Sequence, residues 1–558
     1  MQVLNHIRFD NLRGDLFGGV TAAVIALPMA LTFGVASGAG AAAGLYGAVL
    51  VGFFAALFGG SPTLISEPTG PMTVIMTAVI AGLIAANPEQ GMAMAFTVVM
   101  MAGLFQILFG LLRLGKYVTL MPYTVISGFM TGIGVILIIL QIGPFLGQAT
   151  PPGGVTGTLQ TLPELIAGMH PAETLLAGLS LAIIVFMPKR LRRYAPPQLL
   201  ALLVGTGVSV AFFAEADIRR IGEIPGGLPS LQLPTFSAGQ WQRMVLDAAV
   251  LGMLGSIDAL LTSVIADRLT RAEHNSDKEL VGQGLGNLAS GLFGGMPGAG
   301  ATMGTVVNIQ TGARSALSGL ARALLLLLVI LWAADLTEPI PMAVLAGIAF
   351  KVGFDIVDWS FLARAHRVTF KGALIMYGVI ALTVFVDLVT AVAVGIFVAN
   401  VLTIERLSKL QSRDVKAIKD ADDSDLLDAE EKRLLQQAGG RVVFFALSGP
   451  MIFGLAKAIA RQQMLAKDYD VLVLDLSAVP LLGVTSSLAL EETVTESVEA
   501  GREVFIVGAV GSIRERLDKL RITERLPPEN LIMDRKQALA QALAVLEARG
   551  PGGRREEA

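Results

Sequence analysis

The feature that most constrains this chain is a succession of apolar runs, each about as long as a membrane-spanning helix, that continues to about residue 405. Glycine, proline or charged residues bound each run, as is typical of helices joined by short loops. Of all residues 53% are hydrophobic and only 16% are charged. We therefore expect a polytopic α-helical membrane protein. The first run follows a short polar start without a cleavage-type site, which predicts an uncleaved first helix.

Fourteen segments are expected in this region, two of them short. They lie near residues 14–36, 43–60, 71–85, 92–112, 119–146, 173–188, 197–214, 244–266, 279–295, 302–312, 317–335, 340–354, 370–386 and 388–405. Lys and Arg gather at alternate connections, whereas the loops at 87–91, 147–173 and 334–341 contain none. The positive-inside rule then places both termini on the cytoplasmic side of a plasma (inner) membrane. Arg219 and Arg220, in a loop assigned to the outside, are the exception.

The composition changes after the last apolar run. A charged, polar stretch is followed by short apolar runs typical of buried strands, RVVFFALSG, DVLVLDLS and EVFIVGAV, which alternate with helix-like segments. This pattern predicts a small cytoplasmic α/β domain. The expected organisation is a transmembrane transport domain, a linker, a soluble domain and a disordered tail, at 1–405, 406–438, 439–549 and 550–558 respectively.

Charge and reactive residues exclude several classes of function. The formal net charge of −3 gives no reason to expect nucleic acid or another polyanion as a partner. The absence of cysteine excludes disulfides, thiol catalysis and thiolate metal sites. The four histidines form no ligand-like pair in the sequence, and no nucleophile–base pair is visible. We expect neither a zinc site nor an enzyme.

The third segment opens on SEPTGP, residues 66–71, and its apolar run is too short to cross a bilayer comfortably. Pro68 and Pro71 have no amide hydrogen, so a continuous helix cannot pass through this stretch. Pro71 suits the first turn of a helix that begins inside the membrane, capped by Thr69 or Gly70. Exposed backbone at that depth is tolerated where it is buried in protein or lines a cavity.

The second half has a counterpart at the same ordinal place, tenth of fourteen against third of seven. This segment breaks at Pro297, Gly298 and Gly300 and resumes as a short helix at Ala301 or Thr302. Paired interruptions of this kind indicate an inverted-repeat transporter with its substrate site at the breaks. Two facing helix N-termini, each carrying about +0.5 charge, favour an anion. Kinked helices with packing glycines are the alternative.

The eighth segment carries Asp258 near its middle, where a charge is costly unless it faces a cavity or a partner. Thr262 shares its helix face. A carboxylate, a hydroxyl and backbone carbonyls near Gly300 suit Na⁺ or a proton. With about +1 from the helix ends, a monovalent anion leaves the site at about −1, and Na⁺ returns it to about zero. This balance predicts symport; a structural Asp bonded to a neighbouring helix is the alternative.

Two other side chains lie near these segments. Phe33 is a candidate wall of the anion pocket, with core packing as the alternative. Glu67 is expected either at the mouth of the cavity or as a helix cap. Neither helix start contains Lys or Arg, so the positive field is expected from the backbone alone.

Several motifs together resemble the SulP family of anion permeases that carry a C-terminal STAS domain. They are ALPMALTFGVASG, AGLYGAVLVGFFAALFGG, EPTGPMTV, NLASGLFGGMPGAGATMG and VLVLDLSAVP. The stretches LISEPTGPMTV, LGSIDALLTSVIAD and GAGATMGTVVNIQ are most similar to those of its sodium-dependent bicarbonate transporters. The resemblance covers nearly the whole chain and implies a 7+7 inverted repeat with core and gate subdomains. It also implies elevator-type movement within the membrane lipid, and homodimers that involve the STAS domain.

The resemblance also implies a set of ligands. Bicarbonate would lie between the two helix starts, at Thr69, Gly70, Ala301 and Thr302. Sodium would be held by Asp258, Thr262, Gly300 and Thr302. Many animal relatives carry an arginine where this chain has Gly304, and its absence fits a site that needs Na⁺ to offset the anion. Gly483 and Val484 replace the usual acidic and phosphorylatable residues of the STAS domain, which favours a dimer contact over a phosphoswitch.

Other functions stay open at this point. The same fold could carry sulfate or an organic anion, coupled to protons or sodium. A nucleobase permease is a weaker alternative, because such proteins generally place acidic residues to bond a base. A membrane sensor whose STAS domain recruits a partner would bind the anion without saturable uptake.

Overall fold

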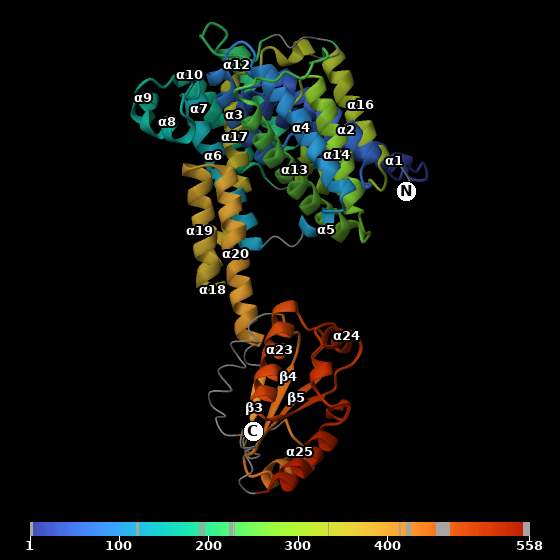
Figure 1. Cartoon of the computed structure of the whole chain (residues 1–558). Helices are drawn as coiled ribbons and strands as arrows, with labels where there is room; N and C mark the ends of the chain where they lie inside the picture. Colours follow the sequence, from blue (N-terminus) through green and yellow to red (C-terminus); the bar gives the residue numbers. More distant parts are fainter. Residues whose placement is uncertain are drawn as a thin grey trace. The chain divides into compact units, whose positions relative to one another are not determined.

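The computed structural model of the chain forms two compact units, Met1–Phe397 and Val398–Ala558, and the boundary falls within helix α20 (Leu388–Gln411). The first unit is helical and the second is built around a sheet (Figure 1). The structure describes residues 4–118, 122–188, 191, 196–222, 227, 229–332, 334–411, 415–419, 426–452 and 469–550.

Each of the fourteen expected segments corresponds to a helix in the described part of the first unit. They are α1 (Leu12–Ser37), α2 (Ala41–Phe58), α3 (Gly70–Ala86), α4 (Gly91–Leu111), α6 (Tyr123–Leu140), α10 (Pro171–Phe186), α12 (Pro197–Phe212), α13 (Trp241–Thr270), α14 (Ser276–Leu292), α15 (Thr302–Gln310), α16 (Leu317–Trp332), α17 (Met342–Ile356), α19 (Phe370–Phe385) and α20. Six of the described helices are long and apolar enough to cross a membrane, and five shorter apolar helices accompany them.

Some helix boundaries differ from the expected ones. The segment expected at 119–146 is divided at Gln141 into α6 and the short helix α7 (Ile142–Phe145), because Pro144 cannot donate the next helical hydrogen bond. The last helix continues past residue 405 to Gln411. Stretches expected to be loops contain α5 (Gly115–Val118), α8 (Gly154–Gln160), α9 (Leu162–Ala167), the 3₁₀ helix η1 (Ala334–Thr337) and α18 (Trp359–Val368).

The helices of the first unit pack in two groups. In one group, α14 packs against α4 and α2, α1 packs against α16 and α2, and α13 packs against α4. In the other, α6 packs against α17 and α19, and α10 packs against α12 and α17. The groups meet where α1 contacts α17 and α12 and where α3 contacts α6. Helices α3, α13 and α15, which carry the candidate site, belong to the first group.

The two arginines that break the charge pattern have structural partners. The Arg219 guanidinium lies 3.0 Å from the carboxylate of Glu173, which is buried at the start of α10. Arg220 donates to the carbonyl of Pro339. Both arginines therefore hold their loop in place. This structural role is separate from the positive-inside rule, which concerns the orientation of short loops.

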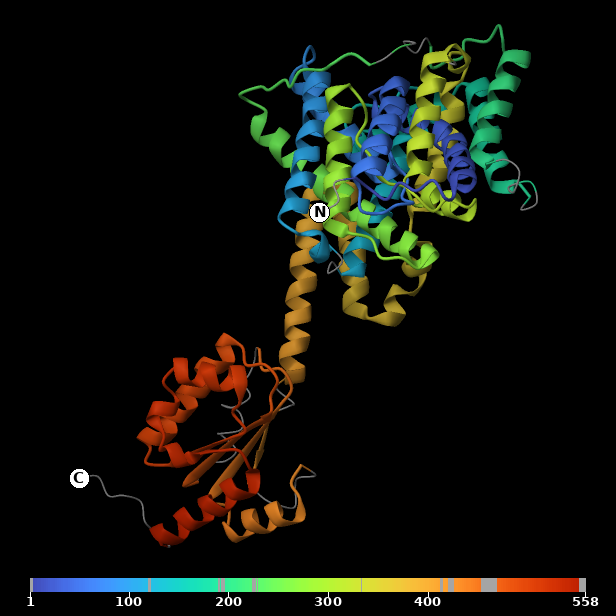
Figure 2. The ribbon, with the colours of Figure 1, turned by 90° about the vertical axis from the view of Figure 1, so that its right-hand side faces the viewer.

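The second unit contains a five-stranded sheet of order β3-β4-β5-β6-β7. Strands β3 and β4 pair antiparallel, and the other neighbours are parallel. The elements are β3 (Val415–Ile418), α21 (Ala429–Gln437), β4 (Val442–Ser448), β5 (Val471–Ala478), α23 (Val484–Glu499), β6 (Glu503–Val507), α24 (Gly511–Lys519), the 3₁₀ helices η3 (Thr523–Arg525) and η4 (Pro528–Asn530), β7 (Leu531–Ile532) and α25 (Arg535–Arg549). Helices α23 and α24 cover one face and α21 and α25 the other, as Figure 2 shows for this unit.

Two elements of the expected linker, 406–438, belong to this sheet domain. Strand β3 extends the sheet, and Ile418 and Leu435 are buried in the core beneath α25. Both elements were assigned to a linker from the sequence, because the stretch is polar, β3 has only four residues and α21 buries only one face. A helix-like segment expected at 450–465 lies mostly outside the described residues, as does the tail beyond Gly550.

Candidate functional site

Two short strands immediately precede the helices α3 and α15. Strand β1 (Ser66–Glu67) pairs antiparallel with β2 (Ala299–Gly300), with Ser66 opposite Gly300 and Glu67 opposite Ala299. The amide of Ala301 also donates to the carbonyl of Ile65 at 2.8 Å. This pairing brings together two chain breaks that lie more than two hundred residues apart. The starts of α3 and α15 are thereby held next to each other.

Helix α3 begins at Gly70, with Pro71 in its first turn and Thr69 at the N-cap position, as the sequence predicts. The Thr69 side chain makes no capping hydrogen bond. Its hydroxyl instead donates to Oδ2 of Asp258 at 2.8 Å. Helix α15 begins at Thr302 after Ala301, which is also extended and without a side-chain cap. Neither start has a side-chain cap, so first-turn amides without a helical partner remain there, which is the arrangement that favours an anion.

The predicted cation ligands converge around Thr262, which is fully buried on α13. Its hydroxyl donates to the carbonyl of Gly300 at 2.9 Å and lies 3.1 Å from the hydroxyl of Thr302. Asp258, half-buried, is one turn earlier on the same helix. The cluster offers only oxygen atoms, one of them from a carboxylate, which is the donor chemistry that Na⁺ prefers. Binding of Na⁺ or bicarbonate by these residues stays a prediction.

A residue of the second helix group also reaches the start of α3. A Cβ at Gly70 would lie 2.3 Å from Cδ1 of Ile356, at the end of α17, and 3.9 Å from Val352. The sequence gives no sign of this contact, because α17 is an ordinary apolar helix. Phe33 is buried in α1, and its place in the wall of the anion pocket stays a prediction.

Glu67 lines neither of the two cavities that are described below, and its carboxylate pairs with a side chain instead of capping α3. It is buried and forms an ion pair with Arg322, which is fully buried within α16. Arg322 was not expected near the site, because it occupies one position in the apolar run LSGLARALLLLLV. Arg322 therefore brings a positive charge to β1 that the Glu67 carboxylate offsets.

Two cavities lined by described residues approach the first helix group, and the lining of neither includes Thr262, Gly300 or Thr302. One of about 820 Å³ is lined by α1, α3, α6, α13 and α19, and on α3 it begins at Val74 rather than at Thr69 or Gly70. The other, of about 520 Å³, is lined by residues that include Ser61 and Asp267. The larger cavity therefore ends short of the helix start.

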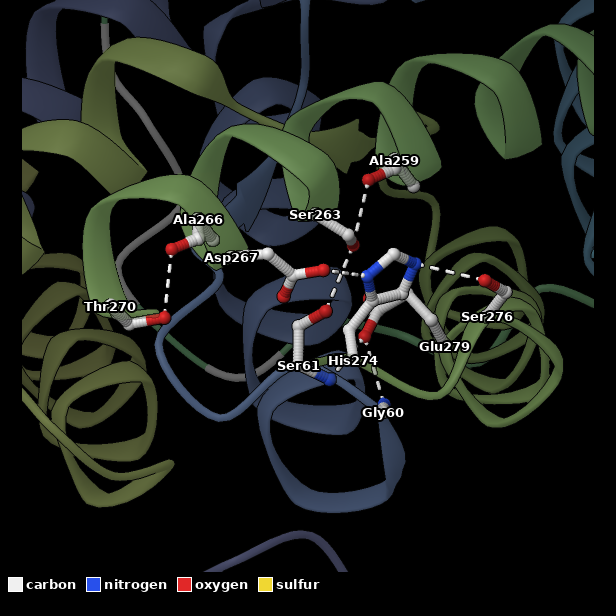
Figure 3. A network of polar contacts seen from close by, with 10 residues as sticks. All are labelled: Gly60, Ser61, Ala259, Ser263, Ala266, Asp267, Thr270, His274, Ser276 and Glu279. Carbon is white, nitrogen blue, oxygen red and sulfur yellow. Dashed lines mark hydrogen bonds and ion pairs between the residues drawn. The ribbon is translucent and has the colours of Figure 1, made fainter. Parts of the chain in front are cut away.

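A polar network stiffens the end of α13 beside the smaller cavity (Figure 3). Nδ1 of His274 lies 2.6 Å from Oδ2 of Asp267, and Nε2 lies 2.9 Å from the hydroxyl of Ser276. The Glu279 carboxylate accepts from the amides of Gly60 and Ser61, both at 2.8 Å. Side-chain hydrogen bonds therefore join α13, α14 and the turn that follows α2.

The fold and the paired helix starts define a helical membrane transporter with a C-terminal α/β domain. Residues 12–379 match the sulfate permease family, to which the chain belongs, and residues 435–538 match the STAS domain. The bicarbonate transporter BicA of Synechocystis sp. is 67% identical over 546 residues, which cover 98% of this chain and 97% of that protein.

Among the solved structures that are similar to this chain are the following two. The transmembrane domain of a cyanobacterial bicarbonate transporter BicA is 72% identical with a TM-score of 0.67, covering 70% of this chain and all of that one. The structure of SLC26A9 has a TM-score of 0.82 at 18% identity, covering 98% of this chain and 92% of that one, and supports the fold alone.

Proposed function

We propose that this protein takes up bicarbonate together with Na⁺ across the plasma membrane. The observation that carries the proposal is the oxygen cluster of Thr262, Gly300 and Thr302 beside Asp258, which adjoins two free helix starts. Two relatives that are 67% and 66% identical over 98% and 97% of this chain are named as bicarbonate transporters, and this supports the choice of anion.

In this proposal the anion binds to the starts of α3 and α15, at Thr69, Gly70, Ala301 and Thr302. Na⁺ binds to Asp258, Thr262, Gly300 and Thr302 and balances the charge of the anion and the carboxylate against the helix dipoles. Thr302 belongs to both sets, because its amide faces the anion and its hydroxyl faces Thr262.

Transport would follow an elevator-type movement of the first helix group against the second. The polar network around Glu279 supports this, since it joins α2, α13 and α14 into a piece that can move as one body. Both termini and the STAS domain would lie in the cytoplasm, and the STAS domain would contribute to a homodimer.

A proton- or sodium-coupled permease for sulfate or an organic anion is the second candidate. It is favoured by the family itself, whose members include proteins named as putative sulfate transporters. Both candidates use the same helix starts, and they differ in the size and charge of the anion.

The test is uptake of radiolabelled bicarbonate into proteoliposomes that contain the full chain, with an inward Na⁺ gradient or with K⁺ alone. We expect Na⁺-dependent uptake that Asp258→Asn abolishes. Asp247→Asn is the matched control, because Asp247 lies on the same helix but pairs with Arg243, 3.6 Å away. Uptake indifferent to Na⁺ would contradict symport, uptake of sulfate alone would favour the second candidate, and binding without uptake would indicate a sensor.

A further inference from the structure

Arg322 and Glu67 form an ion pair inside the membrane unit. Glu67 lies two residues before Thr69 in the chain. Arg322 is fully buried in an apolar helix, and its Nε has no hydrogen-bond partner among the described residues. A charge at such a position is costly even when it is paired. Retaining it therefore calls for a role beyond packing.

The guanidinium of Arg322 donates hydrogen bonds to backbone carbonyls in and beside β1. Its Nη1 donates to the carbonyl of Ser66 at 3.1 Å and to that of Ala48 at 3.3 Å, while Nη2 pairs with Glu67. Gly52 leaves the space for it, since a Cβ there would lie 2.6 Å from Nη1. One side chain thus ties both residues of β1 to α2 and α16.

The opposite strand has its own clamp from α14. Asn287 donates to the carbonyl of Gly298 at 2.9 Å and accepts from its amide at 2.8 Å, just before β2. Gln283, one turn earlier, donates to the hydroxyl of Ser66 at 2.6 Å. Each strand of the pair is therefore held by a polar side chain from a helix behind it, and Arg322 is the charged member.

We propose that Arg322 is a positioning residue for both ligands. By holding Glu67 and the carbonyl of Ser66 it fixes the register of β1 against β2. That register sets where the Thr69 hydroxyl meets Asp258 and where the amides of α3 point. The inference deepens the proposed function and rests on it, because its readout is the dependence of uptake on Na⁺ and bicarbonate.

The test measures the half-saturating concentrations of Na⁺ and bicarbonate for Arg322→Met, Glu67→Gln and the double variant, in proteoliposomes with the amount of folded protein determined. We expect each single variant to raise both concentrations at least fivefold. The double variant, which removes both charges, is expected to fold and still show both increases. Arg322→Lys, which keeps the charge but not the forked contacts, is expected to be intermediate.

A role of the pair through charge alone predicts a different pattern. Glu67→Gln would leave an unpaired positive charge, which weakens Na⁺ binding and strengthens bicarbonate binding. Arg322→Met would have the opposite effects. The double variant would have wild-type half-saturating concentrations. That pattern, or unchanged half-saturation in the double variant, would overturn the positioning role. If neither single variant folds, the double variant and Arg322→Lys decide.

Asp15→Asn is the matched control for lost buried contacts. Asp15 is fully buried and accepts from the amides of Arg314 and Ser315 and from the Ser315 hydroxyl, away from the helix starts. We expect less folded protein and unchanged half-saturating concentrations. Sodium-independent uptake by the wild type would instead count against the proposed function itself.

Discussion

The hydroxyl of Thr69 donates a 2.8 Å hydrogen bond to Oδ2 of Asp258. Thr69 stands at the start of α3, where the anion is proposed to bind, and Asp258 belongs to the proposed cation site. One hydrogen bond thus joins the two sites. Any cation that draws Asp258 toward it changes the partner available to Thr69, which gives a physical route for coupling.

Thr69→Val, which keeps the shape of the side chain but removes the hydroxyl, tests this bond. A hydrogen bond to a charged group is worth about 1.5–3 kcal/mol, so we expect the half-saturating concentrations of Na⁺ and bicarbonate to rise about tenfold or more. Thr69→Ser restores the donor and should remain near wild type in the uptake assay. Equal half-saturating concentrations for Thr69→Val and Thr69→Ser would show that the hydrogen bond has no role in transport.

Thr262→Val is expected to weaken the binding of Na⁺ more than the binding of bicarbonate. The change removes the hydroxyl that bonds to Gly300 and faces Thr302, so we expect at least a tenfold rise in the Na⁺ concentration for half-maximal uptake. At saturating Na⁺ the bicarbonate dependence should recover. Ser256→Ala is the control, because the buried Ser256 hydroxyl donates to the carbonyl of Gly252 in its own helix. A comparable loss there would mean that any lost hydroxyl in α13 has this effect.

Gly70→Ala should reduce transport by displacing the Ile356 side chain, which packs from α17 onto the start of α3. The new Cβ would lie 2.3 Å from Cδ1 of Ile356, so this side chain must take another rotamer. We expect a severalfold lower maximal rate and a recovery in Gly70→Ala with Ile356→Ala. Gly178→Ala, where a Cβ meets no atom within 4 Å, should be neutral. Failure of the double variant to recover would exclude the clash as the cause.

Acid should loosen the start of α21 in the STAS domain. Hydrogen bonds from the backbone of Glu431, then from Lys536, lower the pKa of Asp428. The carboxylates of Asp428 and Glu430 in turn raise the pKa of Lys536 to about 12. A lowered pKa means that the stabilisation is present above the ordinary pKa of Asp, about 4, and is lost as the pH falls through the folded value.

Hydrogen exchange of the α21 amides in the full chain measures this effect. After correction for intrinsic rates, we expect protection to fall below about pH 4 in the wild type. Asp428→Ala should already have weaker protection at pH 7 and little further acid dependence. An identical pH profile for the two proteins would exclude Asp428 as the source.

The interruptions of α3 and α15 were predictable, because proline and glycine act on the backbone locally and Pro68, Pro71 and Pro297 mark the breaks. Asp258 was predictable as a candidate, since a lone carboxylate in an apolar helix demands a partner. The partner itself was not. Thr69 is 189 residues away in the chain and reaches Asp258 because β1 pairs with β2, which packs against α13.

Pairings across long sequence separations were missed for the same reason. Arg322 and Glu67 lie 255 residues apart, and neither residue signals the other. Strand β3 was missed because four residues in a polar stretch carry too little periodicity to be distinguished from a linker. Breaks in a helix can be predicted from neighbouring residues in the sequence, whereas the pairing of distant segments depends on how the helices pack.

The most direct test of coupling is equilibrium binding of radioactive Na⁺ to the purified full chain at increasing bicarbonate concentration. If the two ions share Thr302 and the Thr69–Asp258 bond, bicarbonate must lower the dissociation constant of Na⁺, and Na⁺ must lower that of bicarbonate by the same factor. We predict this reciprocal effect in the wild type and its loss in Asp258→Asn. Sodium binding that does not change with bicarbonate would contradict a coupled site.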